Sequence, residues 1–195
     1  MPFVGKHRDT GERINILTVD NPRDTFQRGE VVCPLCGEPL FIKDGLMRQA
    51  HFSHFGDGCT SDFEHKPESP EHLFFKEYLW RQLKEHFAEY STSEAILEQP
   101  YNEIKRIADI AFRFPSGWDV AHEIQLSAIT IEHIQERTDD YRNAGVDVYW
   151  WLGGAGDSKA VRDWCIREYG GCFILDARKA TEHLALHEVL RHTTG

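Results

Sequence analysis

Two strand-like segments joined by a tight turn constrain this chain most strongly. Residues 106–114 (RIADIAFRF) and 119–127 (DVAHEIQLS) flank Pro115-Ser116-Gly117, three residues that favour turns. If the hairpin folds about Ser116, Asp109 and Glu123 stand seven residues either side of it and become cross-strand neighbours, with Cβ atoms about 5 Å apart. Two like charges so close destabilise a sheet, so we expect a cation between them, most simply a divalent metal ion.

The total composition sets the class of protein. The chain has 195 residues, of which 41% are hydrophobic, which is enough for one sizeable domain and a small module. No apolar run is long enough to span a bilayer and no signal peptide is evident, so we expect a soluble cytoplasmic protein with no membrane partner. The net charge of -10 argues against nucleic-acid binding through bulk charge and requires a local basic patch or metal ions for it.

The hydrophobic pattern predicts an α/β domain with a mixed sheet. A helix begins at Ser69, which suits the N-cap, with Pro70 at the first helical position. Its expected buried stripe is Leu73, Phe74, Leu79, Trp80, Leu83 and Phe87. The further elements predicted are strands over 95–103, 106–114, 119–127, 146–152 and 172–176, and helices over 130–143, 158–169 and 181–192. Ahead of Ser69, residues 12–20 and 39–43 are expected to form short strands.

Five cysteines, two of them in Cys33-Pro-Leu-Cys36, indicate a metal site rather than a disulfide framework. His51, His54 and Cys59 follow in the segment HFSHFGDGC. Zinc takes four such ligands, and a module this small needs a bound metal ion to stabilise its fold. We predict a structural zinc ion held by Cys33, Cys36, His54 and Cys59, with His51 as the substitute for His54. Cys165 and Cys172 lie in apolar surroundings and are expected to be buried free thiols.

A third acid near Asp109 and Glu123 would complete a site for one or two magnesium or manganese ions. Glu71, in the first turn of the helix, is the first choice for this acid, and Glu68 is the second. Gln125 shares the strand face of Glu123 and could orient an attacking water.

Several polar residues near these acids have open interpretations. Lys76, Lys105 and Arg106 are candidate cations, although His72 and Lys76 at i, i+4 are more often surface neighbours. Arg137 and Tyr141 could contact phosphate or form a solvated helix edge, and the spacing of His183 and His187 is best explained by chance.

The helix acid, Asp109 and Glu123-Ile124-Gln125 together resemble the site of the PD-(D/E)XK nuclease superfamily. CPLCGEPL, HFSHFGDGC, ESPEHLFFKEYL, RIADIAF, HEIQLSAIT and ERTDDYRNAGVDVYWWLG occur in the order expected of the CoiA-like competence-protein family, over about residues 1–153. The resemblance implies a zinc-finger-like module followed by a restriction-endonuclease-like mixed sheet flanked by helices. It also implies a role in DNA uptake and recombination.

One position departs from the superfamily pattern: its usual lysine is replaced by Gln125, which cannot act as a cation. We divide the chain into a module over 1–66, a nuclease-like core over 67–153 and an α/β extension over 154–195. The function expected is a Mg²⁺- or Mn²⁺-dependent nuclease acting on single- or double-stranded DNA. The catalytic residues would be Glu71, Asp109, Glu123 and Gln125, and Asp109 and Glu123 would be the metal ligands.

Two other functions fit the same sequence. One is a nuclease-like fold that has lost catalysis and serves as a DNA-binding or recombination-accessory protein, which the missing lysine favours. The other is a zinc-containing interaction protein with no nucleic-acid role.

Overall fold

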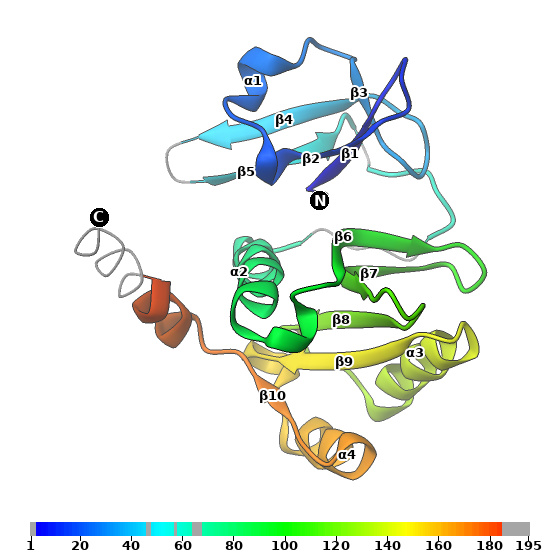
Figure 1. The fold of residues 1–195 in the computed structure, drawn as a ribbon, viewed down its shortest axis with the longest axis vertical. Helices are drawn as coiled ribbons and strands as arrows, with labels where there is room; N and C mark the ends of the chain where they lie inside the picture. The colour runs from blue at the N-terminus through cyan, green and yellow to red at the C-terminus, as the bar shows by residue number, and fades with distance from the viewer. Residues whose placement is uncertain (1–2, 46–47, 57, 64–67, 185–195) are drawn as a thin grey trace.

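The computed structural model describes residues 3–45, 48–56, 58–63 and 68–184. They form an N-terminal module, residues 3–63, and a sheet domain, residues 68–184 (Figure 1). The elements of the module are β1 (Val4–His7), β2 (Arg13–Asn15), a 3-10 turn (Ile16–Thr18), α1 (Pro22–Thr25), β3 (Val31–Val32), β4 (Leu40–Gly45) and β5 (Arg48–His54). Those of the sheet domain are α2 (Pro70–His86), a 3-10 turn (Ala88–Tyr90), β6 (Glu94–Tyr101), β7 (Arg106–Arg113), β8 (Asp119–Gln125), α3 (Ile131–Asn143), β9 (Asp147–Leu152), a 3-10 turn (Gly154–Gly156), α4 (Lys159–Tyr169), β10 (Phe173–Ile174) and helical turns over 177–184.

The sheet domain contains one five-stranded sheet with the order β10-β9-β8-β7-β6. β6, β7 and β8 form an antiparallel meander, whereas β9 runs parallel to both β8 and β10. The predicted mixed sheet is therefore confirmed. β10 extends the same sheet beyond residue 154. The division into 1–66, 67–153 and 154–195 stays a prediction.

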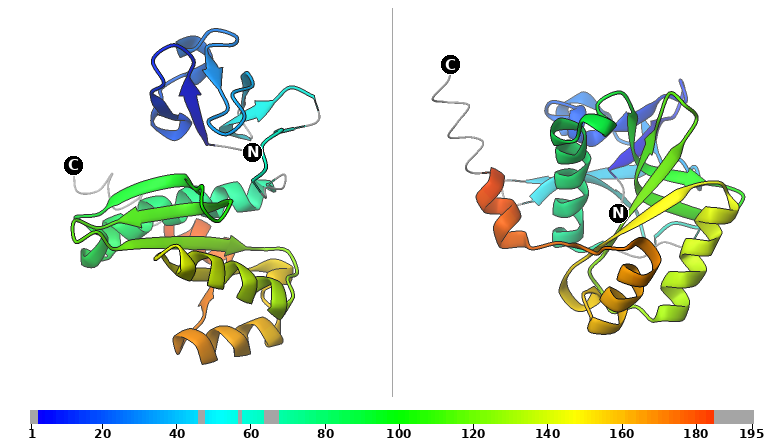
Figure 2. Two further views of the ribbon diagram at one scale, coloured as in Figure 1. Left: turned by 90° about the vertical axis from the view of Figure 1, so that its right-hand side faces the viewer. Right: turned by 60° about the horizontal axis from the view of Figure 1, so that its bottom comes forward.

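Helices cover both faces of this sheet, as Figure 2 shows. α2 packs on one face through Leu73, Phe75, Leu79 and Leu83, against Leu97, Ile110, Phe112 and Ile124. α3 and α4 pack on the other face through Ile134, Tyr141, Val161 and Trp164, against Ala111, Ala121, Val148 and Trp150. The small alanines in the centre of the sheet leave room for the large aromatic side chains of the second layer.

α2 begins where the sequence predicts. The Ser69 side chain accepts a hydrogen bond from the backbone N–H of His72, and Pro70 follows in the first turn. Leu73, Leu79 and Leu83 are buried as expected, and Phe74 and Trp80 are partly buried. Phe87 is wrong as a member of the stripe, because it is the C-cap and is exposed.

The hairpin that carries the candidate acids has the predicted register. Ile110 pairs with His122 and Arg113 pairs with Asp119, so Asp109 and Glu123 occupy the next positions in the same register. β6 continues the row, because Leu97 pairs with Ile110 and Gln99 with Ala108. Glu98 therefore follows Asp109 across the sheet.

The N-terminal module consists of a three-stranded sheet, β2-β1-β3, and the β4–β5 hairpin. The expected strand over 12–20 is only partly right, because a 3-10 turn follows Asn15, and the expected strand over 39–43 is β4. Phe3, Val4, Ile16 and Phe52 belong to the same buried cluster as the apolar residues of α2. The module thus shares its core with the sheet domain.

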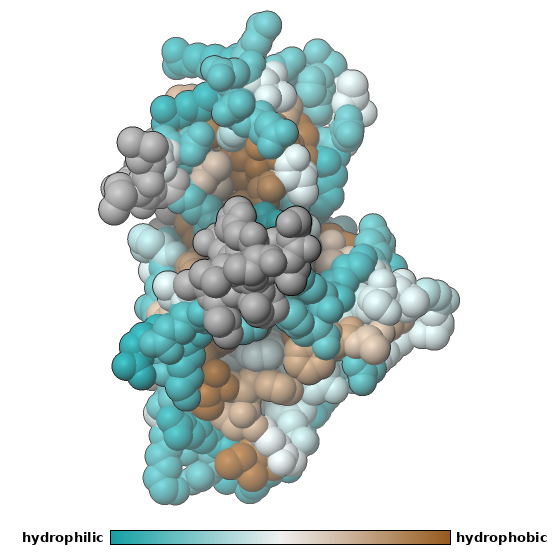
Figure 3. Space-filling model, turned by 60° about the vertical axis from the view of Figure 1, so that its left-hand side comes forward, coloured by the Kyte–Doolittle hydropathy of each residue, from teal (hydrophilic) through white to brown (hydrophobic). Residues whose placement is uncertain are grey.

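The surface is mainly hydrophilic. On the face drawn in Figure 3, hydrophobic residues reach the surface in two areas, one in the module and one in the lower part of the sheet domain. Among the described residues, no helix has the length and apolar character needed to cross a membrane.

His122 makes folding sensitive to acid. Trp151 Nε1 donates to the Nδ1 atom of His122 at 2.9 Å, and the Tyr90 hydroxyl lies 3.1 Å from its Nε2. Because Nδ1 accepts a hydrogen bond, the ring is neutral in the folded protein. Burial lowers the pKa of His122 to about 3. The unfolded chain binds a proton near pH 6.5 that the folded chain excludes, so this contribution to stability falls as the pH drops below about 6.5, by about 2 kcal/mol at pH 5.

We therefore expect His122→Gln to flatten the pH dependence of the free energy of unfolding between pH 7 and 5, measured by urea titration. The exposed His86, replaced in the same way, serves as the control. An equal slope for His122→Gln and the native chain would contradict this assignment.

Candidate functional site

Three cysteines and one histidine converge in the N-terminal module. The ligand atoms of Cys33, Cys36, His54 and Cys59 all lie within 4.8 Å of one another. Two thiolates bound to a tetrahedral zinc ion at about 2.3 Å are about 3.8 Å apart. The Sγ atoms of Cys33 and Cys59 are 3.8 Å apart, and Cys36 Sγ lies 3.4 Å from His54 Nε2. The cluster therefore has the composition and spacing to hold a metal such as zinc.

The surroundings of the thiols also call for a cation. Burial raises the pKa of Cys33 to about 12, so its thiolate forms only beside a positive charge. The Sγ atoms of Cys33 and Cys59 are too far apart for a disulfide bond, and all five cysteines are free thiols. His51 lies outside this cluster and its Nδ1 contacts the Gln49 carbonyl at 2.8 Å.

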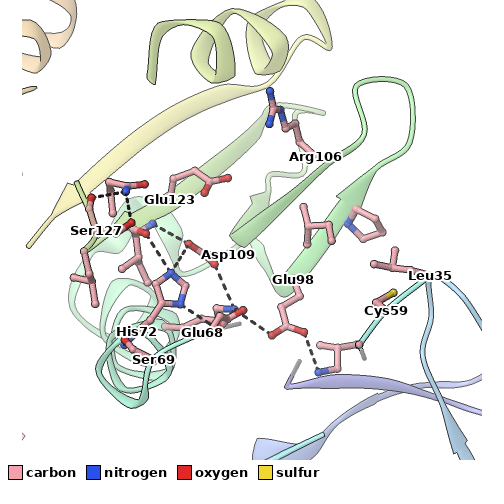
Figure 4. A pocket seen from close by; sticks show the side chains of 18 of the residues that line it. Leu35, Cys59, Glu68, Ser69, His72, Glu98, Arg106, Asp109, Glu123 and Ser127 are labelled. Atoms are coloured by element: carbon pink, nitrogen blue, oxygen red, sulfur yellow. Dashed lines mark hydrogen bonds and ion pairs between the residues drawn. The ribbon is translucent and has the colours of Figure 1, made fainter. Parts of the chain in front are cut away.

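A second group of ionisable side chains lies where α2 meets the sheet, and Figure 4 shows its members Glu68, His72 and Asp109 close together. The centre of this group is Lys76. Only 1% of the Lys76 side chain is exposed. Its Nζ lies 2.7 Å from Glu68 Oε1, 3.1 Å from Glu98 Oε1 and 3.3 Å from Asp109 Oδ1. Burial opposes ionisation, but the three carboxylates outweigh it and raise the pKa of Lys76. The ammonium is therefore charged and ties α2 to β6 and β7.

His72, one helical turn before Lys76, bridges two of the same acids. Its Nδ1 lies 3.1 Å from Glu68 Oε2 and its Nε2 lies 3.2 Å from Asp109 Oδ2. Burial lowers the pKa of His72, but Asp109 and Glu68 outweigh it and raise the pKa to about 10. Glu68, His72 and Asp109 form a second set of residues whose ligand atoms are close enough to hold one metal ion.

Asp109 and Glu123 have different partners, although they are neighbours in register. Asp109 accepts a hydrogen bond from the Ile124 backbone N–H at 2.9 Å, and His72 and Lys76 hold its pKa below the usual range against burial. Glu123 is bound by Arg137 Nη2 at 2.7 Å and by the Tyr141 hydroxyl. Burial raises the pKa of Glu123 to about 6, and Arg137 opposes this shift.

Of the other residues predicted for the site, Gln125 and Glu68 line the cavity beside Asp109, whereas Glu71 does not. Gln125 is buried at the end of β8, and its Nε2 donates to Ser127 O at 2.6 Å and to Ser127 Oγ at 3.0 Å. Glu71 is exposed in the first turn of α2 and does not line the cavity at the site. Glu68, the second choice, lies in the cluster in its place. Glu68, which precedes α2, is therefore the acid of this segment that lies beside Asp109.

A cavity of about 730 Å³ separates the two groups of candidate ligands. Cys33, His54 and Cys59 line it from the module, and Glu68, Asp109 and Glu123 line it from the sheet domain. Arg106, His133 and Arg137 add cationic or ionisable side chains on the β7 and α3 side. Because acids and cations line one space, the cavity can accept both a metal ion and an anionic group such as phosphate.

The structure separates the candidate cations. Lys76 belongs to the acid cluster, so the interpretation of Lys76 as a surface residue is wrong. Lys105 instead pairs with Asp62 at an exposed position, and Arg106 pairs with Asp140. His183 contacts Tyr78, whereas His187 lies outside the described residues.

Sequence reasoning missed Glu98 and the central position of Lys76. A signal for Lys76 exists, because His72 and Lys76 lie one turn apart and so share one face of α2. Nothing comparable marks Glu98, whose φ of +51° is unusual for a residue other than glycine.

The fold and these two clusters define an α/β protein with a cysteine–histidine module. The family model "Competence protein CoiA, nuclease-like domain" matches residues 68–188, and "Competence protein CoiA, N-terminal domain" matches residues 20–62. The first match covers more than half of the chain, which therefore belongs to the CoiA competence-protein family. The resemblance found in the sequence is confirmed.

A curated relative and a solved structure add to this comparison. The chain is 32% identical over 129 residues to the competence protein CoiA of Bacillus subtilis (strain 168), which covers 66% of this chain. It spans only 32% of the length of that relative. A repair endonuclease from Pyrococcus abyssi matches 74% of both chains with 12% identity and a TM-score of 0.32, a likeness too low to carry an argument.

The cysteine–histidine cluster predicts one zinc ion per chain, measured by plasma mass spectrometry on protein purified without chelator. Cys36→Ser and His54→Ala should each lose most of this zinc, because each removes one of four ligands. His51→Ala is the matched control and should keep it. Full zinc content in His54→Ala, or loss only in His51→Ala, would reverse the choice of histidine.

Proposed function

We propose that this protein is a metal-dependent nuclease that hydrolyses phosphodiester bonds in DNA, with a role in DNA uptake, recombination or processing. One observation carries the proposal: Glu68, Asp109 and Glu123 line one cavity together with His72 and Gln125. Membership of a family with a nuclease-like domain supports it. The PD-(D/E)XK type of site is part of the proposal.

Glu68, His72 and Asp109 are the residues that would hold the catalytic ion, because they offer two carboxylates and, once His72 has lost a proton, one imidazole nitrogen to a single point. Glu123 stays a predicted further ligand on the same cavity. A bound Mg²⁺ or Mn²⁺ ion supplies Lewis acidity towards the phosphate and lowers the pKa of a water molecule.

The chain's own residues would position the substrate. Lys76 fixes Glu68 and Asp109 relative to each other through its buried ammonium group. Arg137 lies on the cavity wall and can neutralise a phosphate oxygen. Gln125, anchored to Ser127, presents its amide oxygen as an acceptor for a water proton. Glu71 has no role in this proposal.

The N-terminal cluster is proposed to hold structural zinc. Four protein ligands fill a tetrahedral site and leave no position for substrate. Free thiols that bind zinc fit a reducing compartment, which supports the expected cytoplasmic location.

A specific observation also favours a second function, a nuclease-like DNA-binding or recombination-accessory protein without catalysis. Each acid of the site already has a cationic partner in this chain: Lys76 and His72 for Asp109 and Glu68, and Arg137 for Glu123. Such a network can be stable without a metal ion. DNA binding without cleavage would identify this function.

Replacing a ligand should abolish cleavage. We expect Asp109→Asn and Glu68→Gln to reduce hydrolysis of linear, circular and single-stranded DNA in Mn²⁺ at least about 100-fold, because each removes a charged metal ligand. Glu71→Gln, three residues from Glu68 but exposed, is the matched control and should keep the native rate. Native activity in Asp109→Asn, with the same substrates and metal, would refute the proposed site.

An imidazole ligand should also set the metal preference. Nitrogen ligands favour Mn²⁺ over Mg²⁺, which prefers oxygen. We expect tighter binding of Mn²⁺ than of Mg²⁺ by calorimetry, in protein with zinc retained, and nitrogen coupling in the electron paramagnetic resonance spectrum of bound Mn²⁺. His72→Gln should lose that nitrogen coupling and reduce the difference between the affinities for Mn²⁺ and Mg²⁺. Unchanged coupling in this variant would exclude His72 as a ligand.

A further inference from the structure

Two aromatic and two cationic side chains on the N-terminal module form a row outside the two clusters. The rings of Phe41 and Phe55 lie 4.8 Å apart between centroids. Arg28 Cζ lies 5.5 Å from the Phe55 ring centroid, and Lys43 Nζ lies 5.2 Å from the Phe41 ring centroid. We call this row, Arg28–Phe55–Phe41–Lys43, the aromatic ladder. It consists of two adjacent rings with a cation at each end.

Packing does not account for the ladder. Phe55 is 49% exposed and Arg28 is exposed, so neither contributes much to the core. Within the part of the chain that the structure describes, neither Arg28 nor Lys43 forms an ion pair with an acid. These are two available positive charges on a protein with a net charge of -10. An exposed ring beside cations without acidic partners points to a ligand that is flat and anionic.

The ladder borders the cavity. Phe55 lies between His54 and Gly56, which both line it, and Phe41 pairs across the hairpin with Ser53, which lines it as well. A chain bound along the ladder can therefore continue into the space that contains Asp109 and Glu68. The volume of about 730 Å³ lies in the range of about 300–1,000 Å³ typical of small-molecule pockets, so it suits single nucleotides rather than a duplex.

We propose that the aromatic ladder binds unpaired bases of a DNA strand and leads that strand into the cavity. This rests on the proposed function, because it names the form of its substrate. Unpaired bases expose both faces for stacking on Phe41 and Phe55, and their phosphates are available to Arg28 and Lys43. In a duplex the base faces are already stacked on each other, so the rings would gain nothing from contact.

The test is binding, not cleavage. A labelled oligodeoxythymidylate and a duplex of the same length are titrated by fluorescence anisotropy with the zinc-loaded chain, in low salt without added divalent metal. Phe55→Ala should weaken single-strand binding about 5- to 150-fold, the loss that corresponds to one stacked base. Phe55→Trp should restore it, and neither change should alter duplex binding.

The matched control is Phe87→Ala, since Phe87 is 51% exposed but belongs to the sheet domain. It should leave both affinities unchanged. Arg28→Gln should reduce the slope of log affinity against log salt by about one, because it removes one phosphate contact. Zinc content is measured for every variant, because Phe55 follows the ligand His54.

Three results would overturn the inference: no single-strand binding by the native chain, native affinity in Phe55→Ala, or an equal loss for the duplex. If a Phe55 variant loses zinc, the inference is tested by Arg28→Gln instead, and an unchanged slope of log affinity against log salt in that variant would overturn it. The proposed function fails separately. If the native chain binds single strands in a Phe55-dependent way but cleaves no DNA, the inference about the aromatic ladder is supported and the proposed nuclease activity is refuted.

Discussion

The buried ammonium group of Lys76 is the interaction on which the rest of the structure depends. It binds Glu68 ahead of α2, Glu98 on β6 and Asp109 on β7, so three carboxylates approach one another only because this cation lies between them. Without it, three negative charges would face each other at low dielectric constant, a situation that costs several kcal/mol for each unpaired ion. Lys76, with His72 beside it, therefore ties the sheet, the helix and the segment before the helix together at the site.

The same network ties the N-terminal module to the site. Glu98 accepts hydrogen bonds from the backbone N–H groups of Phe3 at 2.8 Å and Val4 at 3.2 Å, besides its contact with Lys76. Arg13 also donates to the Glu98 carbonyl at 3.1 Å. Glu98 adopts a left-handed conformation to make these contacts, which costs about 1–3 kcal/mol and needs its surroundings to hold it. The module thus contributes to the position of the acids, not only to one wall of the cavity.

The sequence predicted the parts of this fold that local chemistry determines. The turn at Ser116 and the alternation on β7 and β8 were enough for the register of the hairpin, and Ser69 with Pro70 was enough for the start of α2. β1, β3 and β5 were missed. β1 and β3 are short strands that carry little periodic signal, whereas β5 pairs with β4 in a hairpin and its segment was interpreted only as a source of metal ligands. The sequence also provided no reason to expect Glu68, rather than Glu71, beside Asp109, because helix periodicity describes residues inside a helix and Glu68 lies before it.

The position of Lys76 also explains how the site accommodates Gln125. In the PD-(D/E)XK type of site that we propose, the usual lysine would bring positive charge to the strand that carries Glu123. Here the amide of Gln125 is bound to Ser127, whereas the ammonium group beside Asp109 comes from α2. A cation on the helix contacts Asp109 and Glu68, but Glu123 has its own partner in Arg137. The two acids that are neighbours in the sheet therefore belong to different charge networks, and this separation could not be read from their register alone.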